Sequence, residues 1–399
     1  MNKKFTYLLF ALAVLVFAGA MAFVLLHKKN IQPLKNNWEK PIPNQATPAN
    51  LVSIRAEDCG TCHKEHYEEA KLATHTHAWT DEQFQAEIKK ASSPYFCINC
   101  HIPVQNQQEF IVTGLENGDI YKPVKTKNPL FDKKMQAEGI SCATCHVRDG
   151  AIIGAQNLQN APHKVVYAPE KLDESLCISC HNANAVVTAE LVCSFETGDE
   201  WKAGPYFGKK NCVSCHMEEV ERPLVAGYPS RKSHRHYFPG SGIPKHKNLK
   251  TMGMDGLDVL VADKGKYDKT SKIYTIAASL KNTRAGHKVP SGDPERFILV
   301  TYNLLSNAGD TVQTLKHRIG ELWEWYPKAR KLADNNIAPL ETRPVNFSSK
   351  QLTPGAYALH INVSKNRMDQ KTATYNKLSA NYPLGIEMYS KKIAFKVSK

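Results

Sequence analysis

Cysteine is missing from the C-terminal part of this chain, and its absence limits the chemistry of that part. All eleven cysteines of the 399 residues lie between Cys59 and Cys215. Disulfides and metal sites built on thiolates are therefore excluded from the residues after Cys215. Any cysteine chemistry belongs to the segment from Cys59 to Cys215.

The sequence also lacks a stripe in which aromatic and basic residues alternate, although its formal net charge is +14. Proteins that bind single-stranded nucleic acid combine a basic groove with aromatic side chains on which the bases stack. We therefore expect no nucleic-acid partner. The positive charge needs another explanation, which the cysteine pattern supplies.

Ten of the eleven cysteines fall into five copies of one pattern, Cys-x-x-Cys-His, with no clean repeat beyond it. This pattern is typical of covalent attachment of c-type haem. Cysteines three positions apart lie on one side of a helical turn, so both sulfurs can bond the vinyl groups of one porphyrin. The histidine that follows then becomes the proximal ligand of the iron. The cysteine pairs are Cys59 and Cys62, Cys97 and Cys100, Cys142 and Cys145, Cys177 and Cys180, and Cys212 and Cys215. The proximal histidines are His63, His101, His146, His181 and His216.

Zinc sites, redox dithiols and disulfides are the alternatives for paired cysteines. The histidine that follows every pair argues against all of them, so the predicted cofactors are five covalently bound haem c groups. Five haems would add about ten propionate carboxylates, which are ionised at neutral pH. These carboxylates would neutralise most of the apparent positive charge.

An apolar stretch runs from Phe5 to Leu26 near the start of the chain. At ~1.5 Å per residue it spans ~33 Å, enough to cross a hydrocarbon core of ~30 Å. A cleaved signal peptide is the alternative, because Ala18-Gly19-Ala20 resembles a cleavage site, but the apolar run continues to Leu26. We expect residues 1–27 to form a single-pass helix in the inner membrane, with the rest of the chain in the periplasm, where haem is attached. Cleavage would export the rest as well.

The remaining sequence divides into three parts, which together predict an α+β fold. Residues 28–50 are rich in Pro and Asn and predict an extended tether. Residues 51–250 carry the motifs and predict short helices, such as Glu65–Leu72, and loops that wrap porphyrins. Residues 251–399 predict a small antiparallel β-sandwich. Its expected strands are Lys272–Lys281, Arg296–Leu305, Ala356–Val363 and Lys391–Val397, with Trp323 to Trp325 and Ile337–Phe347 as connections or edges.

Three segments resemble a multihaem cytochrome group that includes hydroxylamine oxidoreductase and the tetrahaem cytochrome that accepts its electrons. They are Asp58–Ala78, Glu138–His146 and the sequence from Asn211 to Phe238; Ala285–Arg296 resembles the C-terminal β-module of such cytochromes. The resemblance implies that His75, twelve positions after His63, and a histidine before an aromatic-Gly turn are distal haem ligands. Unlike the hydroxylamine-oxidising enzyme, the chain has five attachment motifs rather than eight, and it has no Cys-x-x-Cys-Lys site.

Five irons need five further axial ligands if every haem is six-coordinate. Bis-histidine ligation closes a haem to substrate and suits it to electron transfer. His163 lies in a loop between two motifs, and His287 would fasten the β-sandwich to the haems. The expected distal ligands are His75, His77, His163, His236 and His287.

Two sulfur-containing residues outside the ligand set need interpretation. Met217 directly follows a proximal histidine, which directs it away from that iron, so we do not expect it to be an axial ligand. Cys193 is the unpaired cysteine; burial as a small apolar side chain is favoured over a redox or intermolecular role.

The sequence favours an electron-transfer protein with no catalytic residues. It would take electrons from a membrane, quinol-linked donor and pass them to a periplasmic or outer-membrane acceptor. Its partners would be redox proteins in or at the membrane, and it could be a subunit of a respiratory complex. The alternative is a reductase or oxidase of a small nitrogen or sulfur compound at one open haem.

Overall fold

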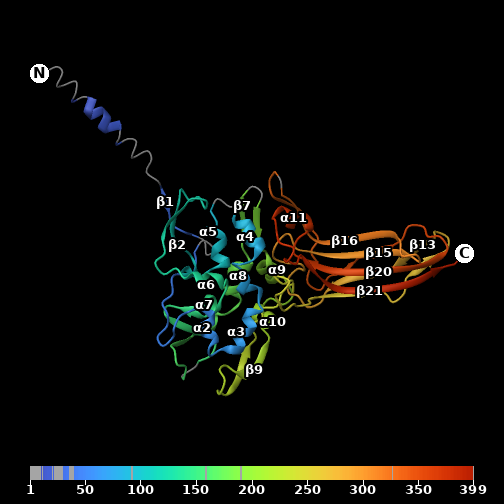
Figure 1. Cartoon of the computed structure of the whole chain (residues 1–399), viewed down its shortest axis with the longest axis horizontal. Coiled ribbons are helices and arrows are strands. Elements are labelled where there is room, and N and C mark those ends of the chain that lie inside the picture. Colours follow the sequence, from blue (N-terminus) through green and yellow to red (C-terminus); the bar gives the residue numbers. More distant parts are fainter. Residues whose placement is uncertain are drawn as a thin grey trace.

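The computed structural model describes residues 10, 12–19, 21, 30–35, 40–90, 93–157, 160–188, 191–325 and 327–398. Two regions follow each other along the chain (Figure 1). Residues 51–250, here called the motif region, combine short helices with small sheets. Residues 251–399, the β-region, combine strands with one short helix and extend away from the motif region.

The helices of the motif region are short, and four of the five cysteine motifs lie wholly on one of them. The motif histidine is the last helical residue at four of the five sites, whereas the first motif begins in α2 and His63 precedes α3. This helical geometry agrees with the expectation that two cysteines share one side of a turn. The helices are α2 (Ala56–Gly60), α3 (Lys64–Lys71), η2 (Thr74–His77), α4 (Glu82–Ile88), α5 (Tyr95–His101), η3 (Gln105–Gln107), α6 (Lys133–Ala137), α7 (Cys142–His146), η4 (Pro169–Lys171), α8 (Glu174–His181), α9 (Thr197–Lys202) and α10 (Cys212–His216).

Small sheets connect these helices, and the sequence did not predict them. Most of their strands pair as antiparallel neighbours, while β5 and β6 are parallel. The strands are β1 (Ile31–Gln32), β2 (Phe110–Glu116), β3 (Pro123–Lys127), β4 (Val147–Arg148), β5 (Ala151–Gly154), β6 (Val165–Tyr167), β7 (Asn184–Thr188), β8 (Leu191–Ser194), β9 (Glu219–Pro223) and β10 (Ser230–His234). Short mixed-polarity strands give little sequence signal, because only a few of their residues face a core.

The β-region is built from antiparallel sheets that enclose one core. Its largest sheet has the order β17-β16-β15-β20-β21, and two three-stranded sheets have the orders β11-β14-β18 and β12-β13-β19. Tyr302 and Leu359 of the large sheet pack in one cluster with Leu280 and Phe347 of the smaller sheets. The elements are β11 (Leu257–Val261), β12 (Lys266–Asp268), β13 (Ile273–Ile276), β14 (Ala278–Asn282), β15 (Phe297–Ser306), β16 (Thr311–Glu324), β17 (Arg330–Asp334), β18 (Thr342–Pro344), β19 (Phe347–Ser348), β20 (Gly355–Asn366), α11 (Gln370–Tyr375) and β21 (Gly385–Val397).

Alternating buried residues explain why these strands could be predicted. In β15 the burial of Phe297–Ser306 alternates along most of its length, as expected for a strand with one face on the core. The predicted strand Lys272–Lys281 is divided between β13 and β14. Trp323, expected in a connection or edge, instead lies within the long strand β16.

The segment expected to be a tether differs from that expectation where it is described. The backbone of Ile42 bonds to Pro103 and Gln105, each at 2.8 Å, and β1 pairs with β2. The backbone N–H of Gln45 donates to Asn106 Oδ1 at 2.7 Å. Much of residues 30–50 therefore lies against the motif region, because its polar groups find partners there.

The predicted membrane helix lies largely outside the described residues, which include Phe10, Leu12–Gly19 and Met21 of that stretch. Among the described residues, no helix has the length and apolar character needed to span a bilayer.

Candidate haem sites

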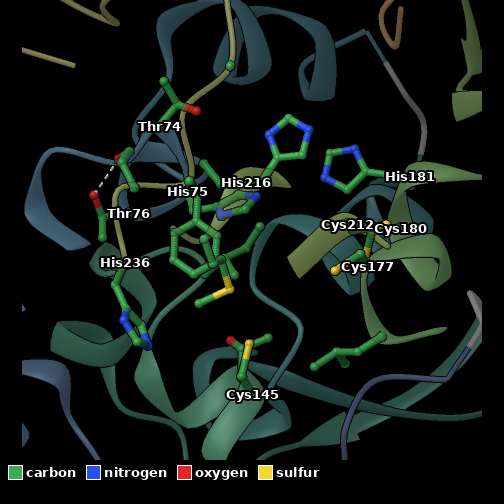
Figure 2. A pocket seen from close by; sticks show the side chains of 18 of the residues that line it. Thr74, His75, Thr76, Cys145, Cys177, Cys180, His181, Cys212, His216 and His236 are labelled. Atoms are coloured by element: carbon green, nitrogen blue, oxygen red, sulfur yellow. Dashed lines mark hydrogen bonds between the residues drawn. The ribbon is translucent and has the colours of Figure 1, made fainter. Parts of the chain in front are cut away.

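One large cavity joins all five cysteine motifs. Its volume is about 3050 Å³, and its lining includes the ten motif cysteines and the five histidines that follow them. Pockets for a single small molecule usually hold ~300–1,000 Å³. The cavity therefore has room for several large cofactors. Figure 2 shows cysteines of three motifs turned toward the same space as His75, His181 and His216.

The proximal histidines are oriented by hydrogen bonds from one ring nitrogen. Nδ1 donates to a backbone carbonyl at four of the five positions, which leaves Nε2 free to face a metal. The acceptors are Leu224 O for His63 (3.3 Å), Ala78 O for His101 (2.8 Å), Ile153 O for His146 (2.9 Å) and Pro239 O for His216 (2.8 Å).

Burial keeps these imidazoles in the form that binds metal. Desolvation lowers the pKa of His181 to about 3 and that of His101 to about 4. The same cause lowers the pKa of His75 to about 4 and that of His236 to about 3. These rings are therefore neutral at physiological pH, and a metal ion does not have to displace a proton from them.

Four proximal histidines each face a second histidine across the cavity. Two imidazoles on opposite sides of one metal ion, with bonds of ~2.0–2.1 Å, have ring centroids ~6.4 Å apart. The observed centroid distances are 6.4 Å for His63 and His163, 6.2 Å for His146 and His236, 6.1 Å for His75 and His181, and 6.4 Å for His216 and His287. The spacing fits a metal held between each pair.

The structure thus brings four of the five expected distal histidines opposite proximal ones, from distant parts of the sequence. His163 comes from the segment before β6, His75 from η2, His236 from the residues after β10 and His287 from the loop between β14 and β15. Their role as iron ligands remains a prediction, which this geometry supports.

His77 has a different position from the other four. It is half-buried in η2 but does not line the cavity. His101 instead stacks on Phe84 with centroids 3.6 Å apart and an angle of 6°. In the part of the chain that the structure describes, no second histidine ring lies near 6.4 Å from that of His101. His77 was expected as the fifth distal ligand without assignment to a particular motif, and its role stays a prediction.

His66 enters the site although it was not among the expected ligands. Its ring lies 4.9 Å from that of His236, too close for the two to face each other across one iron. Its Nε2 is 3.0 Å from Ser233 Oγ. The ring of His66 also lies 6.1 Å from that of His63, perpendicular to it at 88°, so it packs beside both the His63–His163 and the His146–His236 pairs.

Contacts between cysteines of different motifs show how the sites adjoin. Thiols are near enough to shift each other's pKa in three pairs, which join the first motif to the third, the second to the fourth, and the fourth to the fifth. The pairs are Cys59 with Cys142, Cys100 with Cys180, and Cys177 with Cys212. These pairs leave the first and third sites apart from the other three. Cys145 of the third motif links the two sets, because it raises the pKa of Cys177 in the fourth.

The unpaired Cys193 packs with apolar neighbours. It is partly buried against the cluster of Tyr95, Phe96 and Leu115, and desolvation raises the pKa of its thiol. A thiol in such surroundings is a weak nucleophile. This environment favours the structural interpretation of Cys193 over a redox role.

A buried ion network supports one of the distal histidines. The carboxylate of Glu69 accepts hydrogen bonds from Arg222 Nη1 and Nη2 at 2.6 and 2.8 Å and from Arg235 Nη1 at 2.8 Å. It also accepts one from the backbone N–H of His236 at 2.9 Å. Glu69 therefore ties the residues after β10 to α3, directly behind the first motif.

Comparisons with known proteins agree with this site. Residues 58–147, which carry the first three motifs, match the family of cytochrome c554 and c-prime. The chain is similar in fold to a penta-haem cytochrome c552 from Thermochromatium tepidum, with a TM-score of 0.61 and 15% identity over 86% of this chain and 99% of that one. No curated protein matches the chain.

Two other structures match only part of the chain. A CARDB domain from Pyrococcus furiosus has a TM-score of 0.18 and 16% identity, with 38% of this chain and 95% of that one covered. A β-glucuronidase from Bacteroides uniformis has a TM-score of 0.17 and 17% identity, with 37% and 14% covered. Scores this low carry no weight for the fold.

Proposed function

We propose that this chain, a c554-like multihaem cytochrome c, is an electron carrier with five haem c groups. The observation that carries the proposal is the opposition of four histidine pairs at 6.1–6.4 Å within one cavity. A haem closed on both faces by imidazole takes no substrate and supplies one-electron chemistry. The chain's own residues orient the imidazoles and exclude water from them.

The contacts between motifs support the same role. Thiols of different motifs lie near enough to shift each other's pKa in three pairs, so the attachment sites adjoin along the cavity. Cys62 of the first motif is exposed, whereas the other nine motif cysteines are half-buried. We infer that the first site is where a partner protein exchanges electrons with the group.

The proposed location is the periplasmic face of the inner membrane, with residues 1–27 as anchor. The apolar stretch from Phe5 to Leu26 supports the anchor, and covalent haem attachment supports the periplasm. The donor would be a quinol-linked membrane protein, and the acceptor a periplasmic or outer-membrane protein. Membrane fractionation tests the anchor: the haem protein should sediment with membranes and be released by detergent but not by salt.

Low-temperature EPR of the oxidised protein, together with its mass, tests the main proposal. We expect a mass increase equal to five haems and low-spin ferric signals from the four paired sites. A mature protein without added porphyrin, or one in which high-spin signals dominate, would contradict electron transfer through closed haems.

The site at His101 supports a second candidate function. Because no histidine ring faces it in the described part of the chain, the haem at Cys97 and Cys100 could keep one axial position open for a small nitrogen or sulfur compound. We expect one high-spin ferric signal that shifts when hydroxylamine or nitrite is added. If all five signals are low-spin and unchanged by both compounds, the protein is an electron carrier only.

A further inference from the structure

A cluster of charged residues lies beside the second motif, where the β-region meets α4. Lys245 pairs with Asp81, which lies just before α4, and Asp81 Oδ1 accepts a hydrogen bond from Tyr382 Oη at 2.6 Å. Arg367 follows β20 and donates from Nη2 to Ile243 O at 2.8 Å and to Pro244 O at 2.9 Å. Arg367 is therefore fixed beside Lys245 by two backbone carbonyls.

The second guanidinium nitrogen of Arg367 has no protein partner. Nη1 is buried without a hydrogen bond, and only 6% of the residue is exposed. A buried N–H of a charged group that lacks an acceptor is costly, and buried charges are normally paired. The guanidinium also lies over the ring of Tyr382, 4.4 Å from its centroid, and this cation–π contact fixes its orientation as well.

The charges of the cluster do not balance. Asp81 is the carboxylate paired with Lys245, while Arg367 takes part in none of the ion pairs recorded among the described residues. Burial lowers the pKa of Lys245, and the nearby Arg367 and Arg296 lower it further, whereas Asp81 opposes this change. Arg367 is thus left without a carboxylate on the free edge of its buried guanidinium, where a carboxylate from outside the chain would complete its pairing.

The position of the cluster identifies that anion. Lys245, Arg367, Asp81 and Ile243 all line the large cavity. Lys245 and Asp81 are close enough to His101 to influence the pKa of its ring. A haem attached at this motif would bring two propionate carboxylates into the same cavity, and a carboxylate is the partner to which arginine binds best.

We propose that Arg367, with Lys245 beside it, binds a propionate carboxylate of the haem attached at Cys97 and Cys100. The β-region would then complete the site of the second haem as well as supply His287 opposite His216. This inference rests on the proposed haem content and adds a binding role for two residues outside the attachment motifs.

The test is a spectroelectrochemical titration of the full-length holoprotein and its Arg367→Gln variant. We expect one of the five midpoint potentials to move to a more negative value, because a propionate without its cation favours the oxidised haem. The other four should stay in place. Arg367→Lys keeps the positive charge, so its shift should be smaller, and it replaces Arg367→Gln if the latter does not fold.

Arg343→Gln is the matched control, because Arg343 also belongs to the β-region but pairs with Glu341 away from the cavity. It should leave all five potentials unchanged. The inference is overturned if a five-haem Arg367→Gln protein has the potentials of the wild type, or if every potential moves equally. A wild-type mass without haem would instead contradict the proposed function, so the two failures can be told apart.

Discussion

A backbone carbonyl at each of four motifs decides which nitrogen of the proximal histidine can reach a metal. Nδ1 of His101 and of His216 each donate at 2.8 Å, so Nε2 is the atom that faces the cavity. The distal rings of His236 and His287 are held in the same way, at 2.9 Å to His234 O and 2.7 Å to Lys288 O. These six imidazoles therefore share one tautomer, set before any metal binds.

Glu69 is the residue at which a single substitution should affect stability most. Its side chain is only 5% exposed and neutralises Arg222, which is 8% exposed. Removing one partner of a buried ion pair costs ~3–5 kcal/mol, so we expect Glu69→Gln to lower the free energy of unfolding by about that amount. Urea denaturation at neutral pH measures the change.

Glu65→Gln is the control for that experiment, because Glu65 also contacts Arg222 but is 67% exposed. An exposed pair contributes ~0–1 kcal/mol, so its loss should be small. Similar losses in the two variants would show that burial of Glu69 is not what matters.

The same residue should make stability depend on pH in the acid range. Burial alone would raise the pKa of Glu69, but the hydrogen bonds from Arg222, His236 and Arg235 outweigh it and the pKa is lowered. Its contribution is therefore complete above the unfolded value of ~4.3 and is lost as pH falls through the lower folded value. Glu69→Gln should show less loss of stability than the wild type between neutral and strongly acid pH.

At the scale of elements, the loop between β14 and β15 joins the two regions. Ser291 of this loop accepts from or donates to Thr197 at 2.6 Å and donates to Glu200 at 2.8 Å, both on α9. The same loop carries His287, whose carbonyl accepts from Asn282 Nδ2 at 3.0 Å. A metal between His216 and His287 would thus connect α10 to the β-region.

His287→Ala tests that connection. We expect the variant to keep all its covalent haems, because no attachment cysteine is changed, but to gain one high-spin signal in EPR. Added imidazole should convert this signal back to low-spin. His317→Ala is the control, since His317 is half-buried on β16, away from the cavity, with its Nε2 3.2 Å from Asn346 O. An unchanged spectrum for His287→Ala would remove the β-region from the ligand set.

At the scale of the whole molecule, the two regions are stabilised by different cores. The β-region encloses a large cluster that includes Tyr302, Phe347 and Leu359. The motif region has smaller clusters, such as that around Val104 and Met135, arranged about the cavity of about 3050 Å³. A region with so much enclosed apolar surface depends on its cofactors for folding.

In the chain expressed without haem attachment, the motif region should therefore lose its structure while the β-region keeps its own. We expect amide hydrogen exchange to show fast exchange in α5, α7, α8 and α10, and slow exchange in β15 and β20. The holoprotein should protect both regions. If the amide protons of the motif helices exchanged equally slowly with and without haem, the haems would not form the core of that region.

How far the site could be predicted depended on how local its signals are. Cys-x-x-Cys-His is complete within five residues, so the attachment sites could be read from the sequence. A distal histidine has no such signal, and His77 shows the consequence. It is two positions from His75, but the turn of η2 directs only His75 into the cavity. The small strands of the motif region were missed because few of their residues face a core. His66 was missed because its neighbour His236 is distant in the sequence.

The sequence by itself determined the cofactor class, the order of the motifs and the β-strands that follow. Each of these depends on neighbouring residues or on the alternation of apolar and polar side chains along a strand. Only the tertiary structure decided which histidines face each other, which motif lacks a partner and where Arg367 lies. Those facts arise from contacts between residues as far apart as His63 and His163 or His216 and His287. Such contacts are fixed by packing of the whole chain, which no local pattern encodes.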